Sequence, residues 1–357
     1  MPKVSVIIPC YNHAAYIADT VNSVLSQSFT DFELLIADDC SSDNSREILR
    51  AIKDSRVKCI FPEKNMGTVR VLNSLIAASC GEYIATLGSD DIWQKDKLQK
   101  QVDLLDGNPD IGACFSWVDI IDENGNPTDK ADVGEDTFNA DIRSRGELLR
   151  RFYDTGNCIC HSSALVRRSV QDAVGLYNPA LRQLHDYELW VRIANRYPVK
   201  ILCEKLVKYR RAVLKNGSVS ATSLDNTVRH LNEIGFVTYE LVNGLSEDAY
   251  FDGFCGGEKR SMSKAEFLAV KYELLNRHTV CGKRNCEIAN TFLFNNCSEE
   301  FLAAEDENGI SLADIYARTA EQADKYYFND PALKSKNPVN LAKRAIKKII
   351  RSCGGKV

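Results

Sequence analysis

The fold is decided by residues 4–45, whose sequence is VSVIIPCYNHAAYIADTVNSVLSQSFTDFELLIADDCSSDNS. Two short apolar runs, Val4–Pro9 and Phe32–Ala37, have the length and the β-branched content of strands that are buried on both faces. Between them, apolar residues recur at helical spacing, which predicts a helix from about Ala15. A strand, a helix and a second strand in this order predict two parallel strands in one sheet.

The same alternation continues beyond this stretch. Apolar runs predict further strands at Val57–Phe61, Tyr83–Leu87 and Ile111–Val118, and a helical pattern precedes each of them. Ser42 is the expected N-cap of the helix that precedes the strand at Val57–Phe61. We therefore expect an α/β protein with a Rossmann-like, mostly parallel sheet and helices on both faces. In such sheets, ligands bind beyond the carboxyl ends of the strands.

The pattern is less regular after residue 120. Residues 120–145 are polar and predict a loop. We then predict helices at Glu147–Tyr153 and Tyr187–Arg196, strands at Ile159–Val166 and Val199–Leu202, and a loop at residues 208–223. From about Thr227 onward we find only helical patterns. The predicted domains are 1–225 (α/β), 226–335 (an α-helical appendage) and 336–357 (a basic C-terminal helix).

Length and composition exclude several classes of protein. The chain has 357 residues and a net charge of −4, which argues against a general nucleic-acid binder. It contains no apolar run of the roughly 18 residues that a transmembrane helix needs. The first residues do not have the pattern of a signal peptide, so we expect a cytoplasmic protein. The sequence says nothing about the oligomeric state.

Thirteen cysteines are present, which is an odd number, so they cannot all pair with one another. They are scattered and mostly lie within apolar stretches, which favours reduced, buried thiols. A zinc site in the C-terminal third is the alternative, with His278, Cys281, Cys286 and Cys297 as its candidate ligands.

Polar clusters follow three of the predicted strands, at the point where each strand ends. These clusters are Cys10-Tyr11-Asn12, Asp38-Asp39 and Ser89-Asp90-Asp91. Clustered carboxylates suit Mg²⁺ or Mn²⁺, which take oxygen ligands and commonly bind substrate phosphates as well. The alternative for one acidic pair is a solvated turn that caps a helix. Two such pairs on neighbouring strands fit one metal–diphosphate site better than two unrelated turns.

The glycine-rich phosphate-binding motifs GxxxxGK[ST] and GxGxxG are absent. This argues against a P-loop NTPase and a dinucleotide-binding enzyme. A nucleotide would have to be held by side chains and metal. Tyr11 could stack on a base, and Asp39 could accept a hydrogen bond from a pyrimidine N–H. Arg70 could reach the base or the diphosphate, or could form a surface salt bridge.

Residues 4–45 resemble the amino-terminal signature of the family-2 inverting glycosyltransferases with the GT-A fold. The resemblance spans about residues 3–220. It continues through the following segments: NMGTVRVLN (residues 65–73), GEYIATLGSDDIW (81–93), SALVRRSVQDAVGLYNPALRQLHDYELWVRIA (163–194) and VKYRRAVLKNGSVS (207–220). The order and spacing of these motifs are specific for the family but not for a particular sugar.

The resemblance implies a nucleotide-sugar site at the strand ends. Pro9 and Tyr11 would line it, and Asp39 would bind the uracil edge with Asp38 as its support. Ser89-Asp90-Asp91 corresponds to the DxD motif of the family. Asp90 would contact the ribose, and Asp91 would coordinate Mn²⁺ or Mg²⁺ on the diphosphate.

The resemblance also implies a general base, Asp186, in the position of the family's "ED" motif. The chain departs from that motif, because His185 stands where the family usually has Glu. Other residues expected near the acceptor or in the neighbouring loop are His185, Trp190, Arg210, Arg211 and Ser218. Inverting transfer is a single displacement, for which one carboxylate base and one metal on the leaving group suffice.

These features predict a metal-dependent, inverting glycosyltransferase of the hexosyltransferase type. The expected donor is a UDP-sugar, and the expected acceptor is a glycan or a lipid-linked acceptor in surface polysaccharide biosynthesis. One alternative is a catalytically idle GT-A scaffold, against which the intact set of Asp39, Asp91 and Asp186 argues. A sugar-phosphate nucleotidyltransferase is a further alternative, but it would be expected to have a glycine-rich amino-terminal loop.

The carboxyl-terminal segment 331–357 has eight Lys or Arg residues and no Asp or Glu. The net charge of the rest of the chain is therefore eight units more negative than the −4 of the whole chain. Within the segment, apolar residues form one helical stripe and the basic residues lie mainly off it. A basic amphipathic helix over residues 338–357 predicts contact with an anionic membrane surface, and thus a peripheral protein at the inner face of the cytoplasmic membrane. The alternative is a helix docked on the acidic body.

Overall fold

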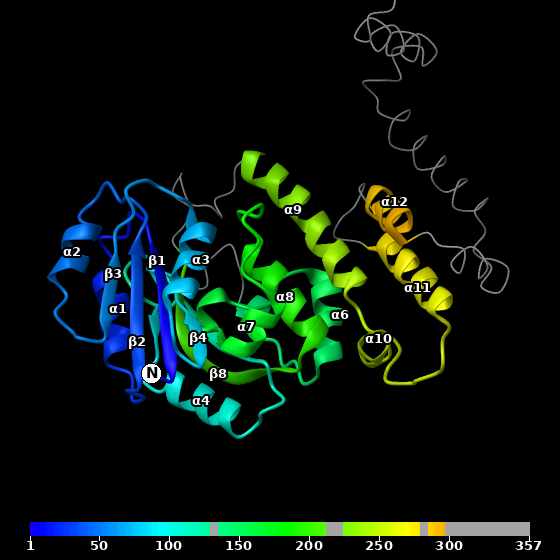
Figure 1. The fold of residues 1–357 in the computed structure, drawn as a ribbon, viewed down its shortest axis with the longest axis horizontal. Coiled ribbons are helices and arrows are strands. Elements are labelled where there is room, and N and C mark those ends of the chain that lie inside the picture. Colours follow the sequence, from blue (N-terminus) through cyan, green and yellow to red (C-terminus); the bar gives the residue numbers. More distant parts are fainter. Residues whose placement is uncertain (129–134, 212–223, 279–284, 297–357) are drawn as a thin grey trace, which may run out of the picture. The chain divides into compact units, whose positions relative to one another are not determined.

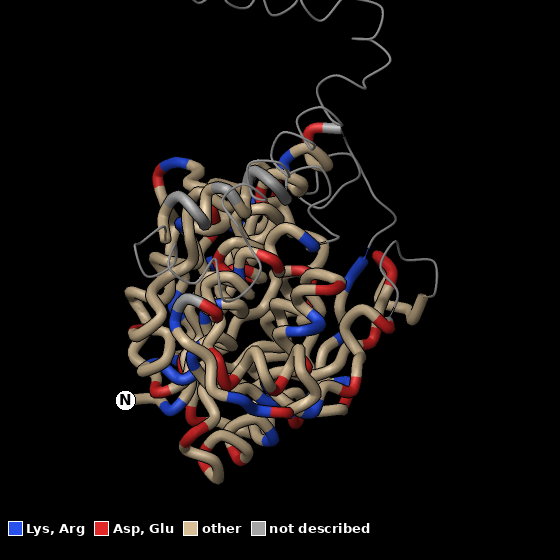
Figure 2. The backbone as a smooth tube through the Cα atoms, turned by 90° about the vertical axis from the view of Figure 1, so that its right-hand side faces the viewer, with Lys and Arg blue, Asp and Glu red and all other residues tan. Residues whose placement is uncertain are grey.

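The structure is a computed structural model that describes residues 1–128, 135–211, 224–278 and 285–296. It divides into two compact units, Met1–Arg260 and Ser261–Val357. Ser218, the predicted 336–357 helix and two of the four candidate zinc ligands, Cys281 and Cys297, lie outside the described residues. Along the described chain, basic and acidic residues alternate rather than separate into long blocks (Figure 2).

The first unit is built on one mixed sheet of eight strands in its described residues, in the order β3-β2-β1-β4-β7-β6-β8-β5 (Figure 1). The strands are β1 (Val4–Cys10), β2 (Phe32–Asp38), β3 (Val57–Ile60), β4 (Tyr83–Thr86), β5 (Ile92–Trp93), β6 (Ala113–Ile121), β7 (Leu165–Arg167) and β8 (Val199–Arg210). Strands β3, β2, β1 and β4 are parallel, and β8 is parallel to β6. Strand β7 is antiparallel to both β4 and β6, and β5 is antiparallel to β8.

Helices follow the strands as expected. They are α1 (Ile17–Leu25), α2 (Ser45–Ala51), α3 (Thr68–Ala78), α4 (Lys97–Asp106), α5 (Glu135–Phe138), α6 (Arg145–Thr155), α7 (Arg168–Val174) and α8 (His185–Arg196). A single 3-10 turn, η1 (His161–Ser163), precedes β7.

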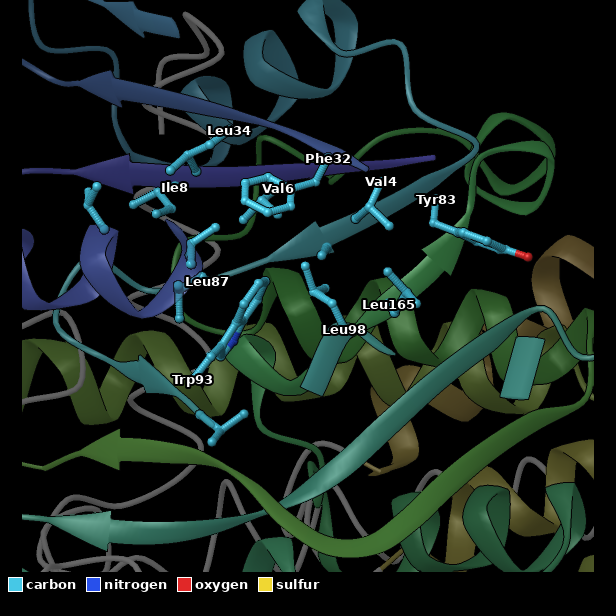
Figure 3. Close-up of a cluster of buried hydrophobic side chains, with 14 of the residues drawn as sticks. Val4, Val6, Ile8, Phe32, Leu34, Tyr83, Leu87, Trp93, Leu98 and Leu165 are labelled. Carbon is cyan, nitrogen blue, oxygen red and sulfur yellow. The ribbon is translucent and has the colours of Figure 1, made fainter. Parts of the chain in front are cut away.

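One hydrophobic core cluster lies on one face of this sheet. Alternate residues of β1, Val4, Val6 and Ile8, point into a cluster that also receives residues of α1 and α4 (Figure 3). Ile7 and Leu35 are equally buried but lie outside that cluster, and α3 contacts β1 and β2. Helices therefore cover both faces, which confirms the predicted α/β class.

Two strands differ from the prediction. Strand β7 is only Leu165–Arg167, because the preceding residues turn in η1 rather than extend. Strand β8 continues to Arg210, so residues 208–210 are paired with β6 and do not belong to a loop. The pairing of β6 with β8 shifts register around Trp117, which interrupts the alternation that would reveal such a strand.

The start of α2 also differs from the prediction. The helix begins at Ser45 rather than after Ser42. The backbone N–H and the hydroxyl group of Ser42 instead donate to Oδ1 of Asn12, at 2.8 and 3.2 Å. Ser42 therefore joins the loop after β2 to the loop after β1.

A helical region follows the sheet, as predicted. Helices α9 (Leu224–Asn243) and α10 (Glu247–Phe254) belong to the first unit, since α9 contacts α8 and α10 contacts α6. The first compact unit therefore includes both helices and ends at Arg260. In the second unit, α11 (Lys264–Arg277) contacts α12 (Asn285–Asn296). No helix in the described part of the chain is long and apolar enough to cross a membrane.

Candidate active site

The loops after β1, β2 and β4 meet at the carboxyl end of the sheet, as the sequence predicts. Cys10 and Asp38 are partners in the β1–β2 register, and the next N–H, of Asp39, donates to the carbonyl of Cys10 at 2.8 Å. Nδ1 of His13 lies 2.7 Å from the hydroxyl group of Ser89, which joins the β1 loop to the β4 loop. The structure thus brings the three predicted polar clusters to one edge of the sheet.

The first two loops have unusual backbone geometry. Asn12 and Cys40 have φ angles of 56° and 64°, in the left-handed region that non-glycine residues rarely adopt. Such conformations cluster at functional sites, where the surrounding structure maintains them. Beside them, the Tyr11 side chain is 49% exposed and Pro9 is half-buried. Both residues are therefore accessible to a ligand.

Asp39 is 4% exposed and organises the loop before α3. Its Oδ1 accepts from the N–H of Met66 at 2.6 Å, and its Oδ2 accepts from the N–H of Gly67 at 2.8 Å. Each carboxylate oxygen has a further lone pair that could accept from a base. The same loop leads to Arg70, which is exposed in the first turn of α3 and has no ion-pair partner among the described residues.

Asp38 is fully buried behind Asp39. Its Oδ1 lies 2.9 Å from Nε of Arg46 and accepts from the N–H of Ser41 at 3.0 Å. Its Oδ2 has no hydrogen-bond partner in the described part of the chain. These contacts suit the predicted supporting role.

The acidic loop after β4, residues 88–91, is held on several sides. The Thr20 hydroxyl group contacts the carbonyl oxygens of Ser89 and Asp91 at 3.1 and 2.8 Å. Asp91 is 2% exposed, and its Oδ1 accepts from the N–H of Arg210 at 2.8 Å. Its Oδ2 accepts from the Ser162 hydroxyl group. This carboxyl group is thus oriented by two other elements, β8 and η1.

Asp90 and Asp91 face the same small space. A Cβ atom at Gly88 would lie 3.0 Å from Oδ2 of Asp91 and 3.1 Å from Oδ1 of Asp90, so only glycine leaves this space open. Burial, and then the neighbouring Asp90 carboxyl group, raise the pKa of Asp91 well above its usual range. A cation between these two carboxyl groups would relieve both effects.

The donor atoms here fit Mg²⁺ or Mn²⁺, because both are carboxylate oxygens. The described residues contain no group of three potential His, Cys, Asp or Glu ligands. A cation at Asp90 and Asp91 would therefore depend on oxygens from a bound diphosphate, which is the usual arrangement for Mg²⁺. The nine cysteines whose side chains the structure describes are all free thiols.

Arg210 has a different place from the predicted loop position. It is a buried residue of β8, and its guanidinium group donates to the carbonyls of Asp90, Asp122 and Glu123 at 2.8–3.0 Å. The group also lies 4.6 Å from the centroid of the Tyr16 ring. These contacts give it a structural part in fixing the acidic loop. Arg211 follows directly, half-buried, with its backbone N–H on the carbonyl of Ile121.

Asp186 lies in the first turn of α8. Its Oδ1 accepts from the N–H of Tyr187 at 2.7 Å, and its Oδ2 accepts from the side-chain amide of Asn157 at 3.1 Å. Burial raises the pKa of Asp186, and the nearby His185 opposes this. A carboxyl group with a raised pKa suits a general base.

Asp186 and Asp91 both act electrostatically on one buried residue, Cys160. Burial raises the pKa of the Cys160 thiol well above its usual range, and the carboxyl groups of both Asp91 and Asp186 add to this effect. The Cys160 sulfur atom is therefore under the electrostatic influence of both carboxyl groups. The predicted metal ligand and the predicted base lie near the same residue.

Aromatic and imidazole rings surround His185. The His161 and Tyr177 rings lie 5.8 and 5.7 Å from it, and Nε2 of His161 lies 2.9 Å from the Tyr177 hydroxyl group. Trp190 is buried and packs against His161 at 6.0 Å. Burial, with a contribution from His185, lowers the pKa of His161 to about 3, so this ring is neutral. His185 is half-buried and is the member of this group next to the base.

Three residues that hold the site together were not selected from the sequence. Ser162 and Asn157 contact the two acidic groups directly. Glu233 of α9 accepts from three consecutive N–H groups, of residues 182–184, at 2.8–2.9 Å, just before α8 begins. The Gly156-Asn157 pair is a turn signal, but serine and glutamate in these positions have no distinctive pattern.

Comparison with known proteins is consistent with this arrangement. The family model "Glycosyl transferase family 2" matches residues 5–174. The chain is 30% identical over 223 residues to the putative teichuronic acid biosynthesis glycosyltransferase TuaG of Bacillus subtilis, covering 62% of this chain and 82% of that protein.

Two solved structures share the fold. TarS 1–349 of S. aureus, in complex with UDP-GlcNAc, has a TM-score of 0.53 at 15% identity, covering 90% of this chain and 91% of that one. The mannosyltransferase PcManGT of Pyrobaculum calidifontis, in complex with GDP-Man and Mn²⁺, has a TM-score of 0.51 at 14% identity, covering 91% and 87%.

Proposed function

The chain belongs to glycosyltransferase family 2, and from this premise we propose that it transfers a hexose from a UDP-sugar to a hydroxyl group with inversion. The proposed acceptor is a glycan or a lipid-linked acceptor of a surface polysaccharide. The relative TuaG is named as a putative teichuronic acid biosynthesis glycosyltransferase. The single observation that carries the proposal is that η1 contacts the surroundings of both acidic groups: Ser162 donates to the Asp91 carboxyl group, and the His161 ring packs against His185, next to Asp186.

The proposed donor site is the edge formed by the loops after β1, β2 and β4. Tyr11 is exposed enough to stack on the base, and Asp39 keeps lone pairs for its N–H groups. Pro9 lines the same edge, and the exposed guanidinium group of Arg70 would be available to the diphosphate. The proteins TarS and PcManGT, which share this fold, bind nucleotide sugars.

The proposed metal is Mn²⁺ or Mg²⁺, held by Asp91 with Asp90 beside it. When bound, it would stabilise the negative charge that develops on the departing diphosphate. Because Ser162 and Arg210 already orient the Asp91 carboxyl group, little reorganisation would be needed.

The proposed base is Asp186. The acceptor oxygen forms a bond to the anomeric carbon, the bond from that carbon to the diphosphate breaks, and the hydroxyl proton passes to the Asp186 carboxylate. The nucleoside diphosphate leaves with the bonding electron pair. His185, Trp190, Arg211 and Ser218 are proposed to lie around the acceptor, whereas Arg210 is proposed to shape the acidic loop.

The proposed location is the cytoplasmic side of a membrane. Residues 338–357, which lie outside the described residues, would bind anionic lipid through their basic side chains. Contact with a membrane would bring the enzyme near a lipid-linked acceptor. No nucleic-acid partner is proposed.

The test is a thermal-shift and UDP-release panel of UDP-sugars, with GDP-mannose as a control, with and without Mn²⁺. Binding to the folded state should raise the unfolding midpoint in proportion to affinity. A UDP-sugar with Mn²⁺ should raise the midpoint and release UDP slowly to water. Binding without any UDP release, even when lipid-linked acceptors are added, would favour the idle scaffold. Pyrophosphate formation from UTP and a sugar phosphate would favour the nucleotidyltransferase.

A further inference from the structure

Asn157 has a fixed orientation toward Asp186. It follows Gly156, whose φ of 87° ends α6, and its Oδ1 accepts from the N–H of Ile159 at 3.1 Å. A backbone N–H can donate only to the amide oxygen, so the other side-chain atom must be the nitrogen. That nitrogen lies 3.1 Å from Oδ2 of Asp186 and donates to it.

Helix α8, which carries Asp186, and helix α6, after which Asn157 follows, are joined independently of this pair. The hydroxyl group of Tyr187 on α8 donates to the carbonyl of Phe152 on α6 at 2.7 Å. The two rings also pack edge to face with centroids 5.1 Å apart. The separation of Asn157 and Asp186 is therefore set by the scaffold, and the hydrogen bond between them loses little entropy when it forms.

We propose that Asn157 is a positioning residue for the general base: its amide nitrogen orients the Asp186 carboxylate and stabilises its ionised form for proton transfer. This proposal rests on the proposed function and names a residue that supports it. Nothing in the motifs of the chain assigns a role to Asn157. The residue lies outside the loops that would hold the nucleotide sugar.

The hydrogen bond from Asn157 is one of a few interactions that favour the ionised form of Asp186. Three titratable groups face Asp186: His185 on α8, Tyr177 in the loop before α8, and Cys160 before η1. Burial raises the pKa of both the Tyr177 phenol and the Cys160 thiol, so both are neutral. The groups that lower the pKa of Asp186 are His185, the Tyr187 N–H, the Asn157 amide and the backbone N–H of Asp186 itself.

The decisive variant is Asn157→Asp. It has nearly the same shape, and its carboxylate can still accept from the Ile159 N–H, so the turn is kept. The donor to Asp186, however, becomes a negatively charged acceptor. The pKa of Asp186 should rise, because a like charge disfavours ionisation. In the pH profile of kcat/KM for UDP release from UDP-N-acetylglucosamine with Mn²⁺, the acidic limb should move up by about one pH unit or more, which is a tenfold loss below the limb. Activity should recover at higher pH.

The matched control is Asn108→Asp. It makes the same change in charge and also removes a donor, to the carbonyl of Leu104 at 2.8 Å, but on the exposed residue after α4. Its acidic limb should remain at the wild-type pH. An unshifted limb in Asn157→Asp, or an equal shift in the control, would overturn the proposal.

A second variant, Asn157→Ser, decides the question if Asn157→Asp does not fold. It removes the amide donor without adding charge, so its limb should move in the same direction but less. The pKa of Asp186 can also be followed without turnover, by carbon NMR of labelled aspartate carboxyl groups assigned with Asp186→Asn. An unchanged pKa in Asn157→Ser would reject the proposal. Absence of UDP release from every donor by the wild-type protein would instead reject the proposed function.

Discussion

The hydroxyl group of Ser162 donates to the Asp91 carboxyl group and accepts from the backbone N–H of Gly88 at 2.9 Å. Its neighbour in η1, His161, packs its ring against His185. One short turn therefore contacts both the acidic loop and the surroundings of the base. Changes in this turn should affect metal binding and proton transfer together.

Removing this hydroxyl group should weaken metal binding. In Ser162→Ala, the Asp91 carboxyl group loses one of its two donors, and outer contacts of this kind typically contribute tenfold to a hundredfold in metal affinity. The Mn²⁺ concentration for half-maximal UDP release should rise by about tenfold. Ser163→Ala is the control, because the buried Ser163 hydroxyl group donates to the carbonyl of Cys160 at 2.8 Å instead. Equal Mn²⁺ requirements in wild type and Ser162→Ala would count against a metal at Asp91.

Asp186→Asn should abolish transfer and leave donor binding intact. The amide cannot take the acceptor proton, and general base catalysis typically contributes about a hundredfold to ten-thousandfold. The Kd for the UDP-sugar, measured by calorimetry with Mn²⁺, should stay within about threefold of wild type. Near-normal turnover in this variant would show that Asp186 is not the base.

Lys97 should make stability depend on pH. It is fully buried, 4.0 Å from the centroid of the Trp93 ring, and burial lowers its pKa to about 7. The unfolded chain keeps its ordinary pKa of about 10.4, so between these values the unfolded state binds more protons and stability rises with pH. The wild type should therefore gain stability relative to Lys97→Met from pH 7 to 10, by at most about 1.4 kcal/mol per pH unit.

The control for this comparison is Lys100→Met, one turn along α4. Ion pairs with Asp96 and Glu204 raise the pKa of Lys100, so its contribution is fully present below the unfolded pKa and is lost only above it. The difference in unfolding free energy between Lys100→Met and wild type, measured by urea unfolding at each pH, should stay constant between pH 7 and 10. If the difference in unfolding free energy between wild type and Lys97→Met does not change with pH, the Lys97 ammonium group is solvated in the folded protein.

Glu233 should connect α9 to catalysis. Its carboxylate is buried and accepts three N–H groups at the start of α8. Glu233→Ala should cost about 1–3 kcal/mol of unfolding free energy and should lower kcat, because Asp186 lies in the turn that follows. Glu233→Gln keeps one acceptor oxygen and should restore part of both. Glu240→Gln on the same helix should retain full activity, since the three N–H groups of residues 182–184 donate to Glu233.

The carboxyl-terminal segment should govern lipid binding. Deletion of residues 338–357 removes most of the eight basic residues of the 331–357 segment. Co-sedimentation with vesicles that contain phosphatidylglycerol should be strong for the full chain and lost after deletion. Both proteins should fail to sediment with neutral vesicles or in high salt. Unchanged sedimentation after deletion would place the lipid contact elsewhere.

The sequence predicted the first half of the fold well, because β1 and β2 are continuous apolar runs with helical patterns between them. It also located the acidic clusters, since parallel strands deliver their carboxyl ends to one edge. It missed the length of β8, where the shifted register and the exposed Glu204 and Lys205 hide the strand. It could not place Ser162, Asn157 or Glu233, whose roles come from contacts between residues far apart in the chain.

Cys160 offers a way to observe the site without a substrate. Its thiol is buried, neutral and under the electrostatic influence of both acidic groups, whereas Cys80 and Cys203 are exposed. Alkylating reagents should therefore modify the exposed thiols first and reach Cys160 only when the surroundings of Asp91 and Asp186 open. The rate of that slow labelling step would report how often the native catalytic centre opens, and its protection by a nucleotide sugar would be a measure of binding.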